Sequence, residues 1–155
     1  MTFSGGDCIL RPVRMMNRWL LALCAVCFLG TPSVYAESPS LLFIGNSYTY
    51  GNDLDQMTAT LLESGGPDWQ GTTATRHAQG GAKFFQHLAE ADGTNGDTAL
   101  RGYLQGAAFF AVMLQEQSQI PGFPQQNELY TQSSAAFRGL NELVSNNGAH
   151  TMALM

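Results

Sequence analysis

Short apolar segments alternate with stretches of helical spacing along this chain, and this order constrains the fold more than any other feature. Residues 41–44 and 109–114 are short, continuous and apolar, which is typical of strands buried on both faces. Residues 72–77, rich in threonine, and the apolar residues 151–155 are two further predicted strands. Successive parallel strands need crossover connections, so the order predicts an α/β fold with a parallel sheet and helices on both of its faces.

The predicted helices lie between these strands. Residues 53–63 carry apolar side chains at helical spacing and are followed by a Gly-Gly-Pro stop. These apolar side chains are Leu54, Met57, Leu61 and Leu62. The further predicted helices are 82–91, 99–106 and 125–146, with a loop at 92–97.

Residues 1–36 are predicted to be a secretory signal peptide. Three arginines precede a 12-residue apolar stretch at 19–30, and small residues stand at positions −3 and −1 of a cleavage site after Ala36. Such a stretch falls short of the roughly 20 residues that cross a bilayer, which favours a cleaved leader over a membrane anchor. Lipidation at Cys24 or Cys27 is the other alternative, although bulky residues precede both. We therefore expect a secreted or periplasmic protein, free of the membrane after cleavage.

The expected mature domain, residues 37–155, is acidic and has no cysteine. All three cysteines of the sequence lie in the leader, so the domain has no disulfide, thiolate nucleophile or cysteine-based metal site. The whole chain has a net charge of −5; without the leader's three arginines and one aspartate, 4 basic and 11 acidic residues remain, a net charge of −7. This acidity argues against nucleic acid and other anionic partners.

Three polar loops follow predicted strands, at 46–52, 79–81 and 115–121. Ligands of parallel sheets bind beyond the carboxyl ends of the strands, so we expect these loops to converge on one site. The first loop places Ser47 on a tight turn directly after a buried strand. A serine hydroxyl on such a turn becomes a nucleophile when N–H donors stand beside it and a base removes its proton. Ser47 is therefore the candidate nucleophile.

Residues 41–49, Leu-Leu-Phe-Ile-Gly-Asn-Ser-Tyr-Thr, resemble the first block of the SGNH (GDSL-type) hydrolases. In that family the nucleophilic serine follows the first strand in a Gly-Asp-Ser or Gly-Asn-Ser turn, and Ser47 matches it. The resemblance implies a three-layer, flavodoxin-like α/β fold and a serine esterase that acts by acyl transfer without a cofactor. The partner it implies is a small-molecule or carbohydrate ester, since exported members often act on acetylated carbohydrates.

The second block of the family resembles residues 79–82, Gln-Gly-Gly-Ala. Its glycine lends a backbone N–H to the oxyanion hole, and Gly81 is the better match, with Gly80 next. The third block, Gly-x-Asn-Asp, is replaced by a glutamine-rich turn that resembles a divergent branch. A glutamine amide can donate to an oxyanion as an asparagine does, so the resemblance assigns this role to Gln115 or Gln117.

The fourth block, Asp-x-x-His, does not occur in the sequence. We expect the gene to continue past Met155 by roughly 40–120 residues and to supply the general base there. A structural role is the default for His77, His87 and His150, and His87 has the best claim as a base within the chain because its predicted helix starts at the glycine loop. No pair of them has metal-ligand spacing on one helix face, so no metal is expected.

Three alternatives compete with this interpretation. Gly45-x-Ser47-x-Thr49 is half of the Gly-x-Ser-x-Gly elbow of α/β-hydrolases, but the second glycine is missing and that elbow follows several strands rather than the first. A flavodoxin-type phosphate loop needs small residues where Tyr48 and Tyr50 stand. In the third alternative the chain is a noncatalytic ligand- or sugar-binding domain, or an inactive fragment of this fold, in which Ser47 only donates a hydrogen bond.

Overall fold

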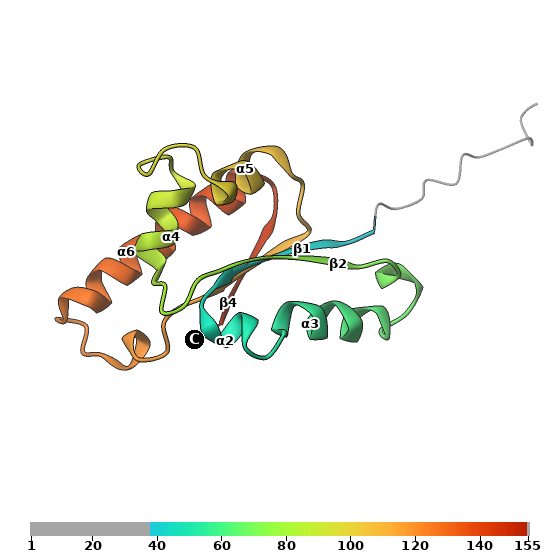
Figure 1. The fold of residues 1–155 in the computed structure, drawn as a ribbon, viewed down its shortest axis with the longest axis horizontal. Coiled ribbons are helices and arrows are strands. Elements are labelled where there is room, and N and C mark those ends of the chain that lie inside the picture. The colour runs from blue at the N-terminus through green and yellow to red at the C-terminus, as the bar shows by residue number, and fades with distance from the viewer. Residues whose placement is uncertain (1–37, 155) are drawn as a thin grey trace, which may run out of the picture. The chain divides into compact units, whose positions relative to one another are not determined.

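Four parallel strands form one sheet at the centre of the protein (Figure 1). The structure, a computed structural model, describes residues 38–154, and the predicted signal peptide lies outside them. The strand order is β2-β1-β3-β4, so β1 and β3 lie in the middle of the sheet. The predicted parallel sheet is confirmed. The strands are β1 (Ser40–Gly45), β2 (Thr73–Ala78), β3 (Ala111–Gln115) and β4 (His150–Leu154).

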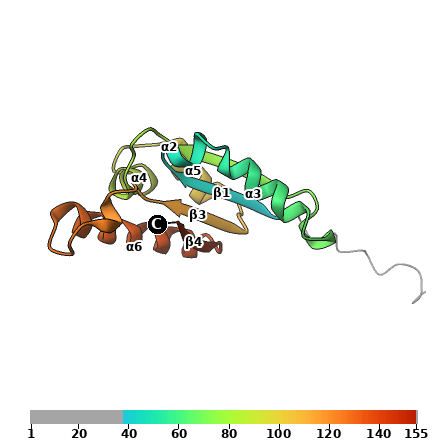
Figure 2. The same ribbon diagram turned by 90° about the horizontal axis from the view of Figure 1, so that it is seen from below.

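Helices cover both faces of the sheet, which gives the expected three layers. Figure 2 shows α3 on one side of the strands and α6 on the other. The longer helices are α3 (Leu54–Glu63), α4 (Phe84–Ala91), α5 (Ala99–Gly106) and α6 (Glu128–Asn146). Shorter helical turns that the sequence did not predict are α2 (Ser47–Tyr50), η1 (Pro67–Trp69) and η2 (Ile120–Gly122). Among the described helices none combines the length and the apolar character that a membrane span requires.

The two central strands divide the core into two clusters by their alternation. Side chains that point to one face pack with α4, α5 and α6, and include Leu42, Ile44, Val112 and Leu114. Side chains of the opposite face pack with Leu54 and Leu62 of α3, and include Leu41, Phe43, Ala111 and Met113. Every residue of β3 and all but the first of β1 are buried, as expected for strands covered on both sides.

Helix α3 is rotated relative to its apolar pattern. Met57 and Leu61 are 63% and 72% exposed, whereas Asp55 faces the sheet and is 2% exposed. The carboxylate of Asp55 lies 3.1 Å from the guanidinium of Arg76 on β2. A buried carboxylate needs such a partner. The expected apolar face of residues 53–63 is therefore only half right, because the ion pair to β2 selects the side of the helix that faces inward.

The different environments of two leucines test this arrangement. Leu140 on α6 is fully buried, and Leu61 on α3 is mostly exposed. Replacement of Leu140 by Ala is expected to lower the free energy of unfolding by about 2–5 kcal/mol, because it leaves a cavity in the core. The matched change Leu61→Ala is expected to alter it by less than about 0.5 kcal/mol. Urea unfolding followed by circular dichroism measures both; equal losses would contradict the rotation of α3.

Candidate active site

The turn at the carboxyl end of β1 presents Ser47 to solvent. Asn46 caps α2: its side-chain oxygen accepts a hydrogen bond from the Tyr48 N–H at 3.1 Å, as asparagine commonly does at this position. Asn46 itself is buried, while Ser47 is exposed as the first residue of the helix. The sequence prediction that Ser47 stands exposed between a buried strand and a helix agrees with the structure.

Gly45 allows this turn to close because no side chain would fit there. A Cβ atom on Gly45 would lie 2.3 Å from the Thr49 hydroxyl and 3.0 Å from the Gln115 side-chain oxygen. Both neighbours are buried, so neither has free space to move into. The glycine is thus required by the close approach of β3 and α2 to the end of β1.

Gln115 at the end of β3 holds the turn from the neighbouring strand. Its Oε1 accepts hydrogen bonds from the Asn46 N–H at 3.2 Å and from the Thr49 hydroxyl at 3.1 Å. Its Nε2 donates to the carbonyl of Glu116. Both ends of this amide are therefore engaged. One of the two N–H groups of Nε2 is thus used within the protein, and the other would have to serve as the predicted oxyanion donor.

Gln117, the other predicted amide donor, is placed differently. It lies half-buried in the loop after β3, and its Oε1 accepts from the Gln119 N–H at 2.9 Å. Within residues 38–154 its Nε2 makes no hydrogen bond. Of the two glutamines, Gln117 is the less buried and has both N–H groups of its amide free of hydrogen bonds to residues 38–154.

The loop after β2 meets the turn after β1. The Asn46 side-chain nitrogen donates to the Ala82 carbonyl at 3.4 Å. Gly80 lies against Tyr50, whose hydroxyl would be 3.2 Å from a Cβ at that glycine. Gly81 has φ +69, in the left-handed region that favours glycine, and the space where its Cβ would stand is open.

The loop after β3 also contacts the turn after β1. The Ser118 hydroxyl lies 3.4 Å from the Tyr48 hydroxyl, so the two exposed tyrosines of α2 reach to both neighbouring loops. The expectation that the three polar loops meet at one edge of the sheet is confirmed. Ser47, Gly80, Gly81, Gln115 and Gln117 all lie at this edge or in its loops.

Glu116 is a buried carboxylate at this edge that the sequence analysis did not single out. Its Oε1 accepts from the Phe84 N–H at 3.2 Å and from the Gln117 N–H at 2.6 Å, and its Oε2 accepts from the Ser133 hydroxyl. These donors satisfy a charge that would otherwise be costly to bury. Glu116 therefore joins the end of β3 to α4 and α6.

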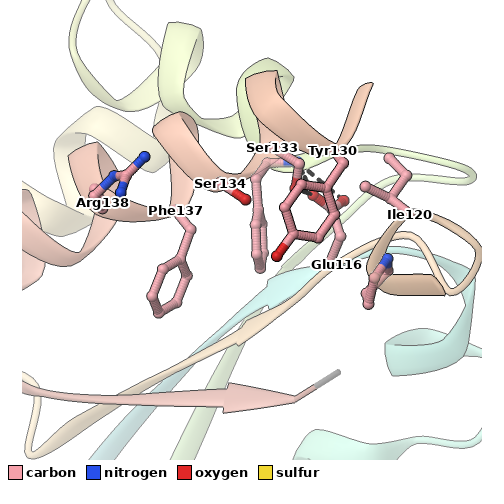
Figure 3. A pocket seen from close by; sticks show the side chains of 9 residues that line it. Glu116, Ile120, Tyr130, Ser133, Ser134, Phe137 and Arg138 are labelled. Atoms are coloured by element: carbon pink, nitrogen blue, oxygen red, sulfur yellow. Dashed lines mark hydrogen bonds between the residues drawn. The ribbon is translucent and has the colours of Figure 1, made fainter. Parts of the chain in front are cut away.

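A cavity of about 370 Å³ opens beside Glu116, between η2, α4 and α6. Figure 3 shows Ile120, Tyr130 and Phe137 around it, with the Ser133–Glu116 hydrogen bond at its wall. Its volume is within the range of small-molecule sites, and its apolar walls with a few polar groups are typical of them. The lining residues are Phe84, Glu116, Ile120, Pro121, Tyr130, Ser133, Ser134, Phe137 and Arg138.

Among residues 38–154, no histidine forms a hydrogen bond to Ser47 as a free base would. His87 on α4 is buried, and its Nε2 lies 2.9 Å from the Gly45 carbonyl, so it holds the turn after β1 from the side of α4. Burial lowers the pKa of His87 below its usual value, which favours the neutral ring. The Nε2 of His77 lies 2.6 Å from Glu90. His150 begins β4 and stands at the opposite, amino-terminal edge of the sheet.

The comparisons with known proteins bear on the fold. No family model matches the chain, and no curated protein is significantly similar to it. A solved structure described as a "putative SGNH hydrolase from Slackia heliotrinireducens" matches with a TM-score of 0.60 and 26% sequence identity. The fold is that of an SGNH hydrolase. The match covers 76% of this chain and spans 55% of the other, so this chain corresponds to about half of that protein's length.

Two glycines test whether the turn after β1 depends on the space at Gly45. Gly45→Ala is expected to lower the free energy of unfolding by about 1–3 kcal/mol, because the added methyl group overpacks the turn. The control is Gly102→Ala on α5, where nothing lies within 4 Å of the new Cβ. There the change is expected to stabilise by about 0.5–1 kcal/mol, since alanine is the better helix former. Chemical unfolding that gives the two variants the same sign would refute the prediction.

Neighbouring serines on α6 test the role of Glu116. Ser133 donates to the buried carboxylate, whereas Ser134 lines the same cavity without that bond. Loss of a hydrogen bond to a buried charged group is expected to cost about 1.5–3 kcal/mol in Ser133→Ala. Ser134→Ala is expected to change stability by less than about 0.5 kcal/mol. Thermal or urea unfolding of the two variants measures the difference, and a loss in Ser134→Ala as large as in Ser133→Ala would count against it.

Proposed function

We propose that this protein is a secreted serine esterase that hydrolyses an ester by acyl transfer, with Ser47 as nucleophile. The observation that carries the proposal is that Ser47 is exposed, whereas the backbone of the two residues before it is held by hydrogen bonds. The Gly45 carbonyl accepts from His87 and from the Gln79 N–H, and the Asn46 N–H donates to Gln115. A nucleophile that is held in place before the substrate arrives avoids the cost of orienting it during the reaction.

The proposed oxyanion hole takes one donor from each of the three loops. The Ser47 N–H is one, because the first N–H groups of a helix have no partner within the helix. Gly81 is the second, since its exposed left-handed backbone leaves its N–H side unscreened by a side chain, with Gly80 as the alternative. Gln117 is the third, favoured over Gln115 because it is less buried and its Nε2 makes no hydrogen bond to residues 38–154. Such donors stabilise the charge that develops on the carbonyl oxygen of the ester.

The proposed base is a histidine of an Asp-x-x-His block beyond Met155. His77, His87 and His150 each contact a group other than Ser47: Glu90, the Gly45 carbonyl and the Phe110 ring, respectively. The imidazole would take the Ser47 proton on attack and return it to the leaving alcohol, and the aspartate would orient the ring.

The proposed substrate is an acetylated carbohydrate. The cavity beside Glu116 supports a ring-shaped, polar ligand, because its walls combine aromatic faces with hydroxyl and carboxylate groups. Export through the leader would place the enzyme where extracellular polysaccharide occurs.

A noncatalytic ligand-binding domain is the second candidate function. It is favoured by the lack of a hydrogen bond between Ser47 and any histidine among residues 38–154. The converging loops and the cavity would then hold a sugar or another polar ligand, with Ser47 as a hydrogen-bond donor only.

Labelling of the full-length natural protein by a fluorophosphonate probe separates the two functions. The wild type is expected to be labelled on Ser47, and Ser47→Ala is expected to abolish the labelling. The matched control is Ser145→Ala, an exposed serine near the end of α6, which is expected to label as the wild type does. Mass spectrometry of the labelled peptide identifies the residue.

Two outcomes would contradict the esterase. Labelling that persists in Ser47→Ala removes Ser47 as nucleophile. A folded wild-type protein that is not labelled, yet binds acetylated oligosaccharides in calorimetry, indicates the noncatalytic domain instead.

A further inference from the structure

Three side chains with metal-ligating atoms meet behind the Ser47 turn, on the side of α4. His77 comes from β2, and His87 and Glu90 lie one helical turn apart on α4. One ligating atom from each lies within 4.8 Å of the others. The side chain of His87 is 1% exposed, and those of His77 and Glu90 are 14% and 17% exposed.

The hydrogen bond between His87 and Gly45 determines which ring nitrogen of His87 carries the proton. A carbonyl oxygen only accepts, so the Nε2 that lies 2.9 Å from the Gly45 carbonyl carries the proton. The Nδ1 of the neutral ring is then an acceptor. It is buried without a hydrogen-bond partner in the described part of the chain.

A carboxylate oxygen, which is also an acceptor, lies close to this nitrogen. Glu90 Oε2 lies 4.0 Å from His87 Nδ1. Two lone-pair atoms that face each other at this distance need a donor or a cation between them, because a buried acceptor without a partner is costly.

We propose that this cluster is a binding site for a divalent transition-metal ion of the zinc class, held by His77 Nε2, His87 Nδ1 and Glu90 Oε2. Imidazole nitrogen and carboxylate oxygen are among the ligands that zinc takes in proteins, commonly in sets of three with water in the fourth position. The partial exposure of His77 and Glu90 leaves a side from which the ion and that water can enter.

Groups around the three ligands are arranged as they are around known metal sites. The Gly45 carbonyl accepts the other ring N–H of His87, the contact that fixes the tautomer of a ligating histidine. The Gln79 side-chain nitrogen donates to Glu90 Oε1 at 3.0 Å and leaves Oε2 directed to the cluster. Both contacts orient ligand atoms before an ion binds.

Binding requires a small rearrangement and the movement of a proton. His77 Nε2 and Glu90 Oε2 are 2.6 Å apart, whereas two ligands at about 2.0–2.1 Å from a tetrahedral ion stand about 3.4 Å apart. The proton between His77 Nε2 and Glu90 Oε2 must also move, to His77 Nδ1 or to solvent, because the ion takes its place. The ion would join β2 to α4 and is independent of the proposed hydrolysis.

Calorimetric titration of the purified chain with zinc chloride tests the site. Cys8, Cys24 and Cys27 are replaced by serine in every sample, so that thiolates do not compete for the ion. One zinc ion per chain is expected to bind, and to raise the thermal unfolding midpoint, whereas magnesium is expected to do neither. Glu90→Gln and His77→Gln are each expected to weaken zinc binding at least about tenfold, since each removes a ligand.

The control variant is His150→Gln, which removes the histidine that stands outside the cluster. It is expected to bind zinc as the parent does, which distinguishes the cluster from general binding to surface imidazoles. Circular dichroism establishes that each variant is folded. The proposal is overturned if folded parent protein binds no zinc at millimolar concentration, or if Glu90→Gln and His77→Gln bind as tightly as the parent. A water molecule between His87 and Glu90 would then satisfy the buried nitrogen.

Discussion

The side-chain oxygen of Gln115 holds the end of β3 against the turn that begins α2, and the geometry of the site depends on this contact. It accepts from the Asn46 N–H and from the Thr49 hydroxyl, so a single buried atom fixes both the start and the interior of the short helix. Close approach of this kind is available only because Gly45 has no side chain. On the side of α4, the ring of His87 donates a hydrogen bond to the Gly45 carbonyl. Ser47 is thus exposed while the residues before it are buried and bonded on both sides.

Glu116 extends the same arrangement toward α4 and α6. The strand β3 ends in two consecutive buried polar side chains that point to opposite faces: Gln115 bonds to the turn after β1, and Glu116 bonds to the start of α4 and to α6. The loops after three strands are therefore positioned by hydrogen bonds that originate at one point of the sheet. A cavity of a size suited to a small ligand lies next to this point.

The sheet and most helices could be predicted from the sequence because they rest on local patterns. The apolar run at 109–114 and the regular spacing in 125–146 each need only their own residues to be recognised. The orientation of α3 could not be predicted in this way, because it depends on the ion pair between Asp55 and Arg76 of β2. Glu116 was missed for a similar reason: its donors come from three separate segments. The cluster of His77, His87 and Glu90 could not be predicted from residue spacing on one helix, because His77 lies on strand β2.

The strand order also bears on how the protein is made. The apolar strand β1 is synthesised before its two neighbours, yet it pairs with β2 about 33 residues later and with β3 about 70 residues later. Parallel pairing between distant segments is slow, since the chain must close long loops before the contacts form. An emerging chain therefore carries its most hydrophobic strand uncovered while the ribosome adds the residues that will flank it. During that interval β1 is the segment with which a chaperone or another nascent chain would associate.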